Sequence, residues 1–305
     1  MKVIVYTTYG DSGVIQLTEA GKPGPKENEI LIKIAATTVN PFDMKLRSGV
    51  FQKLMPVSFP FIPGSDAAGT VEAVGNNVSR LKVGDEVFAT TSGGTYAEYV
   101  VVKEDQAATI PADVSLSEAA ALAVPLVTAY TFLVEGGHLK AGQKILIHGA
   151  AGGVGGVMVQ MAKALGAYVI GTASGDGLAL ARSFGADEVI DHKTQDFTQL
   201  VKDADLVIDL AGGETQVKSF GVVKEGGLLL SAVMPPSEEL AKQYHIDARF
   251  MSSDPSYKKL EFGKKLVEEG KIKAQIAKTL KLADAARAQD LVSAGGLNGK
   301  VVLVI

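Results

Sequence analysis

The sequence predicts an α/β protein with two parts, one rich in β-strands and one built on an open parallel sheet. Its length of 305 residues accommodates about two domains. Up to about Pro111, short β-rich runs alternate with turn residues, whereas strand-like and helix-like segments alternate from there to about residue 250. The alternation of strand-like and helix-like segments is typical of parallel strands that helices connect and cover.

The strand candidates follow from short runs of β-branched and aromatic residues between turn signals. In the first part they are residues 29–34, 68–75 and 96–102. In the second part they are residues 144–148, 168–172, 188–191, 206–210, 228–232 and 246–251, a number that suits a doubly wound sheet. A charged amphipathic helix is expected at 257–269, and the final apolar strand, 300–305, is expected to join the sheet of the first part.

Composition excludes several classes of protein. Hydrophobic residues make up 47% and charged residues 21% of the chain. The apolar stretch 119–134 has 16 residues between Glu118 and Glu135, and we expect Pro125 to interrupt it. Because a spanning helix needs about 20 apolar residues, we expect no membrane span. The first residues enter strand-like sequence directly, without a signal segment, so a cytoplasmic protein is expected.

Charge and cysteine content narrow the chemistry further. Thirty basic and 34 acidic residues give a net charge of −4, without a basic block that could follow a phosphate backbone, so no nucleic-acid partner is expected. The chain has no cysteine, which excludes disulfides, thiolate nucleophiles and cysteine-ligated metal sites.

A glycine-rich loop follows the strand at 144–148 and precedes a helix at 158–165. In such a turn, glycines let the backbone approach a pyrophosphate, whose charge meets free amides and the positive end of the helix dipole. We therefore predict dinucleotide binding rather than a simple tight turn. The predicted contacts are Gly149, Ala151, Gly152, Gly153, Val154, Gly155 and, on the next strand, Thr172.

The residues at the end of the strand that starts at residue 168 indicate whether the protein binds NADH or NADPH. An NAD-binding protein usually carries Asp or Glu there, whereas this chain has Ala173 and Ser174, which favour NADPH. Asp176 lies two residues further on and leaves NADH open as the alternative. The candidate partners of a 2′-phosphate are Ser174, Arg182, His192 and Lys193; an exposed structural role is the alternative for the last three.

Several motifs together resemble one superfamily over the whole chain. They lie at residues 40–43, 63–71, 83–87, 94–99, 149–156, 184–187, 207–213 and 299–302. The chain resembles the medium-chain dehydrogenase/reductase superfamily, and within it the zinc-free quinone oxidoreductases related to zeta-crystallin. The resemblance implies a GroES-like substrate domain (1–122 and 265–305), a Rossmann NADP-binding domain (123–264), a cofactor contact at Ala211 and a homodimer.

The residues at the zinc positions of this superfamily bear on the mechanism. Asn40 stands where zinc-dependent relatives carry a cysteine ligand, and Ser65 and Asp66 stand where they carry His and Glu. The cysteine-rich lobe that holds a second zinc in those relatives is absent. Carboxylates alone hold zinc poorly, so we expect no metal, and a zinc alcohol dehydrogenase is the least favoured alternative.

Without zinc, the resemblance implies hydride transfer from NADPH to a quinone or a conjugated carbonyl compound in a cleft between the two domains. It implies catalytic roles for Asn40 and Asp43 and, near the nicotinamide, for Thr128. The structural alternatives are a turn at Asn40, a helix N-cap at Asp43, and a Thr128 hydroxyl bonded within its own helix.

Other side chains do not identify the substrate. The relatives often carry tyrosines where this chain has Lys45 and Phe51, so no phenol donor is expected, although Phe51 can stack on a quinone. We expect packing roles for Tyr96 and Tyr99, and a place for His148 at the end of its strand, since the four histidines form no catalytic triad. An alkenal, enone or enoyl-thioester reductase and a low-turnover NADPH-binding redox sensor remain the alternatives.

Overall fold

The structure is a computed structural model that describes residues 1–305 as two compact units. Unit 1 comprises Met1–Val124, Pro255–Lys264 and Ala274–Ile305. Unit 2 comprises Pro125–Asp254 and Lys265–Lys273. The helices α2 (Leu116–Tyr130) and α8 (Tyr257–Glu268) each contribute residues to both units.

Unit 1 is built on a seven-stranded sheet in the order β14-β15-β3-β4-β5-β7, with β6 also paired to β3. Its strands are β3 (Glu29–Val39), β4 (Asp66–Val74), β5 (Glu86–Thr90), β6 (Tyr99–Lys103), β7 (Ala107–Thr109), β14 (Ile276–Lys281) and β15 (Lys300–Val304). A two-stranded sheet, β1 (Lys2–Val5) with β2 (Gln16–Glu19), and the helices α1 (Pro41–Arg47) and α9 (Ala285–Ala294) complete the unit.

Isoleucines of β3 contribute to the core of unit 1. Ile30, Ile32 and Ile34 are buried on one face of the strand and pack with residues of β4, β5 and β6, while Lys33 between them is exposed. Val301 and Leu303 of β15 belong to a second cluster that includes buried residues of α9.

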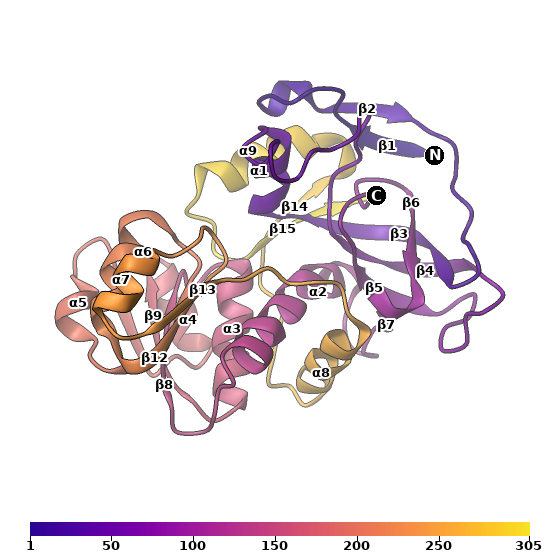
Figure 1. The fold of residues 1–305 in the computed structure, drawn as a ribbon. Helices are drawn as coiled ribbons and strands as arrows, with labels where there is room; N and C mark the ends of the chain where they lie inside the picture. Colours follow the sequence, from indigo (N-terminus) through magenta and orange to yellow (C-terminus); the bar gives the residue numbers. More distant parts are fainter. The chain divides into compact units, whose positions relative to one another are not determined.

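The last strand of the chain completes this sheet. β15 pairs antiparallel with β3 and parallel with β14, and Figure 1 shows the yellow C-terminal strands beside the indigo β3. The prediction that the final strand joins the β-rich part is therefore confirmed.

Unit 2 is a six-stranded sheet in the order β10-β9-β8-β11-β12-β13, and every pair in it is parallel. Its strands are β8 (Lys144–His148), β9 (Tyr168–Ala173), β10 (Glu188–Asp191), β11 (Ala204–Asp209), β12 (Val223–Ser231) and β13 (Asp247–Phe250). All six predicted strands are confirmed, and the order is that of a doubly wound dinucleotide-binding sheet.

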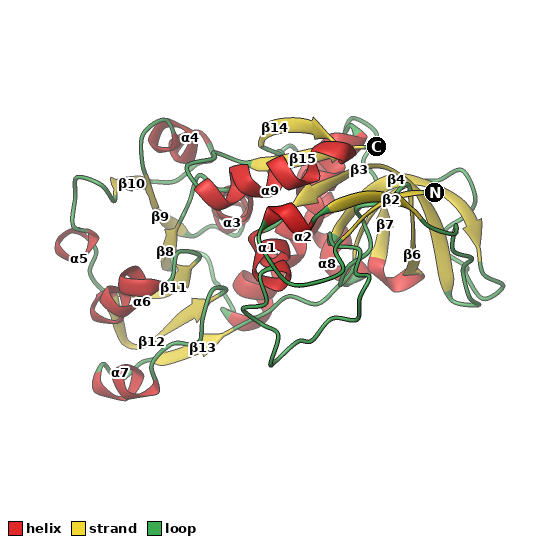
Figure 2. Cartoon of the chain, turned by 90° about the horizontal axis from the view of Figure 1, so that it is seen from above, coloured by secondary structure: helices red, strands yellow, loops and turns green.

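Helices cover both faces of this sheet. They are α3 (Gly153–Ala164), α4 (Gly177–Ser183), α5 (Phe197–Leu200), α6 (Gly213–Ser219) and α7 (Glu238–Gln243). Figure 2 shows α3 and α4 on one side of the sheet and α5, α6 and α7 on the other. Because parallel strands all end at one edge, the loops that follow β8, β9 and β11 lie together at that edge.

The apolar stretch around Pro125 is a continuous helix. α2 includes Pro125 and passes into a π-helical segment, Thr131–Gly136, so the expectation that proline interrupts the stretch is wrong. The combined helix, Leu116–Gly136, has 21 residues and is long and apolar enough to cross a membrane by length and composition alone. However, 78% of its most apolar window is buried inside the protein, as in a core helix.

Candidate functional site

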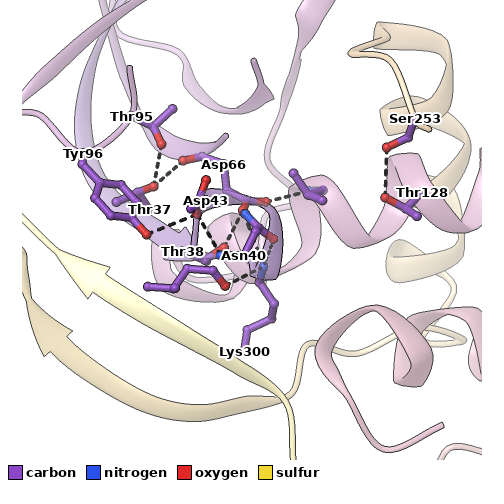
Figure 3. A network of polar contacts seen from close by, with 12 residues as sticks. Thr37, Thr38, Asn40, Asp43, Asp66, Thr95, Tyr96, Thr128, Ser253 and Lys300 are labelled. Carbon is purple, nitrogen blue, oxygen red and sulfur yellow. Dashed lines mark hydrogen bonds and ion pairs between the residues drawn. The ribbon is translucent and has the colours of Figure 1, made fainter. Parts of the chain in front are cut away.

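The strand register of unit 1 gathers four polar side chains. The pairing of β15 with β3 brings Lys300 opposite Asn40, the residue that follows β3. The pairing of β4 with β3, which places Ala68 opposite Ala36, brings Asp66 to the side chain of Thr38. Because side chains alternate along a strand, Thr38 and Asn40 share one face, and Figure 3 shows the four residues together.

Asp66 is the acceptor at the centre of this network. Its side chain has no exposed surface, and the exposed fractions of Asn40 and Lys300 are 6% and 5%. Asp66 Oδ2 accepts hydrogen bonds from the Thr38 hydroxyl and from Asn40 Nδ2, the latter at 2.7 Å, and lies 3.5 Å from the Lys300 ammonium. Oδ1 accepts from the backbone N–H of Val124 at 2.7 Å. Every polar atom of the buried carboxylate is therefore satisfied.

The orientation of the Asn40 amide is determined by its partners. Lys300 Nζ donates to Asn40 Oδ1 at 2.6 Å, while Asn40 Nδ2 donates to Asp66. An ammonium group only donates and a carboxylate only accepts, so the amide has a single possible assignment of oxygen and nitrogen. Its second Nδ2 hydrogen remains as a free donor.

Asp43 lies behind Asn40, in the first turn of α1. Its Oδ2 accepts from the backbone N–H of Asn40 at 2.9 Å and from the Tyr96 hydroxyl at 3.3 Å. Burial raises the pKa of the Asp43 carboxyl to about 7; the charge of Asp66 raises it further, whereas the Asn40 hydrogen bond and Lys300 oppose the rise. Asp43 therefore changes protonation near neutral pH.

The structure partly confirms the structural alternatives for Asn40 and Asp43. Asn40 is the N-cap of α1, and Asp43, from the third helical position, returns a hydrogen bond to the Asn40 backbone. Asp43 thus stabilises the helix start, although it is not itself the N-cap. Neither role uses the side chain of Asn40, which turns to Asp66 and Lys300 instead.

Thr128 belongs to unit 2, on α2, and is 8% exposed. Its hydroxyl lies 3.1 Å from the hydroxyl of Ser253 (Figure 3). The partner recorded for Thr128 is thus a residue far along the chain, and the alternative of a bond within its own helix is not what the structure shows.

The glycine loop of unit 2 has the geometry of a backbone anion site. It follows β8, and Gly152 is the N-cap of α3 without a side chain to occupy the first helical amides. Gly149 has φ +75°, a left-handed conformation that favours glycine. A Cβ at Gly155 would lie 2.1 Å from the Gly149 carbonyl oxygen, whereas one at Gly152 would meet only that oxygen, at 3.3 Å. Gly155 is required by the loop itself, whereas a Cβ at Gly152 needs only a small shift of the Gly149 carbonyl.

The remaining loop candidates lie in the same unit. Ala151 is buried, Gly153 and Val154 form the first turn of α3, and Ala211 is exposed after β11. Asp209, which ends β11, accepts hydrogen bonds from the backbone of Ala211 at 3.0 Å and of Gly212 at 2.7 Å, and so shapes the loop after β11.

The candidates for a 2′-phosphate separate into two groups. Ser174 follows β9, and the backbone N–H of His192 donates to the Ala173 carbonyl at 3.1 Å, so Ser174 and His192 follow neighbouring strand ends. Arg182 is exposed in the last turn of α4, away from the end of that helix at which Ser174 lies. Asp176, the alternative selector of NADH, is the exposed N-cap of α4.

Sequence reasoning missed several members of the network. Lys300 was seen only as the start of a strand and Tyr96 only as a packing residue, yet both contact the group around Asn40. A lysine that opens an apolar, buried strand was the available signal, because a buried ammonium requires an anionic partner. The chain contains no group of three or more His, Cys, Asp or Glu residues placed to hold a metal ion.

Comparisons with known proteins agree with this architecture. Residues 26–112 match the family model of the alcohol dehydrogenase GroES-like domain, and residues 184–303 match that of zinc-binding dehydrogenases. Mouse quinone oxidoreductase is 32% identical over all of this chain and 98% of its own length. A tomato 2-methylene-furan-3-one reductase is 41% identical over 77% of this chain and 64% of its own. The structure of Escherichia coli quinone oxidoreductase complexed with NADPH superposes with a TM-score of 0.92 at 29% identity, covering both chains completely.

A GroES-like domain combined with a doubly wound parallel sheet defines an oxidoreductase of the medium-chain dehydrogenase/reductase superfamily. The full-length similarity is more specific than that. The chain belongs to the quinone oxidoreductase family.

The Lys300 ammonium is required to balance the buried charge of Asp66. Lys300→Met keeps the aliphatic stem and leaves the carboxylate without a cation, which typically lowers the free energy of unfolding by about 3–5 kcal/mol. Urea unfolding followed by circular dichroism measures this change. Lys278→Met on β14, where the lysine is exposed, is the control and is expected to change stability by less than about 0.5 kcal/mol. Equal effects of the two variants would contradict the role of Lys300.

Proposed function

We propose that this protein is an NADPH-dependent, zinc-independent reductase that transfers hydride to quinones. The observation that carries the proposal is the Asn40 amide, which is fixed by Lys300 and Asp66 and keeps one free N–H donor. Such a donor stabilises the negative charge that develops on an acceptor oxygen as hydride arrives. Catalytic roles for Asn40, Asp43 and Thr128 are part of the proposal.

The glycine loop fits the pyrophosphate of a dinucleotide. The side-chain-free space at Gly152 and the open amides of α3 form a cradle that any larger residue would fill. Bound NADPH would supply the hydride. Gly149, Ala151, Gly153, Val154, Gly155 and Ala211 would surround the cofactor through their backbone, and Ser174 and His192 would meet the 2′-phosphate.

The chain's own residues would handle charge and the proton. Lys300 places a positive charge 2.6 Å from Asn40 Oδ1, which polarises the amide and strengthens its free N–H as a donor. Reduction of a quinone by one hydride also consumes one proton. Asp43, whose pKa lies near neutrality, is the group that would hold this proton below about pH 7.

Zinc independence is supported by the donor atoms that this chain carries at the ligand positions of zinc-dependent relatives. Asn40 and Ser65 are weak zinc ligands compared with Cys and His. Asp66 is already bonded at both oxygens, and the Lys300 ammonium beside it repels a second cation. Prolonged dialysis against a strong chelator should leave turnover unchanged.

A second candidate function is reduction of a conjugated enone. It is favoured by the similarity to the tomato furanone reductase, and it uses the same donor on the substrate oxygen. We also propose that the protein is a homodimer, which light scattering would test. A cytoplasmic location is proposed as well.

The deciding experiment is NADPH oxidation at 340 nm with 1,4-benzoquinone, 9,10-phenanthrenequinone, an alkenal, an enone and an enoyl thioester. Turnover well above the uncatalysed rate with quinones supports the proposal. Preference for the enone or thioester selects the second candidate. If the protein binds NADPH tightly but reduces none of these acceptors, the proposed reaction is wrong and the alternative of an NADPH-binding redox sensor is favoured.

Substitution of Gly152 should separate cofactor binding from folding. Gly152→Val places a side chain in the proposed pyrophosphate cradle, and its Cβ meets only the Gly149 carbonyl oxygen, at 3.3 Å, so the variant should fold and lose NADPH binding in calorimetry. Gly21→Val, at an open position of unit 1, is the control and should keep full affinity. Gly155→Ala should instead destabilise the loop, because of its 2.1 Å contact. Unchanged affinity in Gly152→Val would disprove the loop assignment.

The protein should bind NADPH at least tenfold more tightly than NADH, a difference of about 1.4 kcal/mol that one charge-assisted phosphate contact supplies. Ser174→Asp should remove the preference, because a carboxylate repels the phosphate and accepts from ribose hydroxyls. Dissociation constants for both cofactors provide the measurement. Equal constants in the parent protein would assign the choice to Asp176.

Asn40→Ala should lower kcat on a quinone about 100-fold or more at nearly constant NADPH affinity, as expected for loss of one preorganised donor. The hydrogen bonds to Asp66 and Lys300 imply that this variant also loses stability, so rates must be measured well below its Tm. Thr38→Val is the matched control, since it removes another hydrogen bond to Asp66. Equal losses of kcat in both variants would reduce Asn40 to a structural role.

The dependence of kcat/KM on pH should reflect the protonation of the Asp43 carboxyl. With a pKa of about 7, the carboxyl holds its proton at lower pH and loses it above, so kcat/KM should fall about tenfold per unit at higher pH. Asp43→Asn preserves the two accepted hydrogen bonds but cannot titrate. That variant should be slower and show no decline in this range; an unchanged profile would exclude Asp43 as the proton source.

A further inference from the structure

His148 is a buried histidine that the proposed reaction does not use. It ends β8 immediately before Gly149, and its side chain is 1% exposed. Both ring nitrogens have partners: Nδ1 lies 3.2 Å from the Thr172 hydroxyl, and Nε2 lies 2.9 Å from the Ser219 hydroxyl. His148 therefore connects the strand end next to the glycine loop with β9 and with the last residue of α6.

The direction of these hydrogen bonds follows from Ser219. The Ser219 hydroxyl donates its single hydrogen to the Thr215 carbonyl at 2.7 Å, so toward His148 it acts as the acceptor. The hydrogen of the neutral ring must therefore be on Nε2, and Nδ1 accepts from the Thr172 hydroxyl. Burial, which lowers the pKa of His148 to about 4, keeps the ring neutral; Asp209 opposes this shift and His192 adds to it.

The Thr172 hydroxyl then has a lone pair directed to the loop. It accepts from the backbone N–H of Gly149 at 3.3 Å, and the Thr172 carbonyl accepts from the N–H of Ala150 at 2.9 Å. Four hydrogen bonds thus run in one direction, from Gly149 N–H through Thr172, His148 and Ser219 to the Thr215 carbonyl. Thr172, predicted as a cofactor contact, is 3% exposed and uses its hydroxyl within this chain.

We propose that His148 is a positioning residue for dinucleotide binding: its Nε2–H tautomer orients Thr172 and thereby holds Gly149 and the glycine loop ready for the pyrophosphate. The inference rests on the proposed dinucleotide site. A preorganised loop loses less conformational entropy when a ligand binds. Loss of this chain of hydrogen bonds, the relay, therefore weakens affinity even where no contact to the ligand is removed.

Ser219→Ala tests the relay from its far end. Ser219 is fully buried and belongs to α6, so the substitution removes one oxygen that is not among the predicted cofactor contacts. Calorimetry on the cofactor-free protein, well below its Tm, should show NADPH affinity weakened about three- to tenfold. Histidine ¹⁵N shifts should show the Nε2–H tautomer in the parent protein and a change toward Nδ1–H in the variant, with His148→Phe identifying the signal.

A double-mutant cycle distinguishes a relay from independent packing. Thr172→Val cuts the same chain at its near end, so Ser219→Ala/Thr172→Val should lose little more affinity than the worse single variant. Thr172→Ser keeps the hydroxyl and should restore affinity to within about twofold of the parent. Multiplicative losses, an Nδ1–H tautomer in the parent, or unchanged affinity in Ser219→Ala would each overturn the proposal.

Failure of the dinucleotide site itself gives a different result. If the parent protein does not bind NADPH, the proposed function fails, while the tautomer and the hydrogen exchange of the Gly149 amide still report on the relay. Faster exchange of that amide in Ser219→Ala supports the relay, and unchanged exchange contradicts it.

Discussion

The carboxylate of Asp66 is the constraint on which unit 1 depends. A buried anion is costly unless cations and hydrogen-bond donors surround it, and Asp66 has no exposed surface. Its donors come from β3, from the residue after β3, from β15 and from α2. Segments that are distant in the sequence must therefore meet at one point, which specifies the strand register and places the C-terminal strand in the sheet.

The same charge arrangement supports the proposal of a reaction that needs no metal ion. In the proposed reaction, the positive charge nearest the substrate oxygen would be the Lys300 ammonium, which would act through the Asn40 amide. Lys300 and Asp66 hold the Asn40 amide from opposite sides, so its free hydrogen has a defined position. Burial raises the pKa of Asp43 to about 7, so in the proposed reaction protonation of Asp43 at lower pH would reduce the negative charge that opposes a developing oxyanion.

In unit 2, the proposed dinucleotide site depends on backbone geometry rather than on side-chain charge. Gly155 allows α3 to approach the loop after β8, and Asp209 holds the backbone of the loop after β11. His148 contributes as a neutral group whose two nitrogens play opposite roles, one as acceptor and one as donor. Its burial favours this state, since a charged ring would lose hydration and would present a donor to Thr172.

The sequence by itself determined the elements whose signals are local. The six parallel strands, the loop from Gly149 to Gly155 and the joining of the last strand to the first part follow from periodicity, glycine spacing and apolar runs. The expectation that Pro125 interrupts its apolar stretch was wrong, because α2 continues through this proline. Only the tertiary structure decided that Lys300 lies on Asn40, that Tyr96 donates to Asp43 and that Ser219 sets the tautomer of His148. These contacts depend on strand register and burial, and residues up to 260 positions apart meet through them, so no local pattern specifies them.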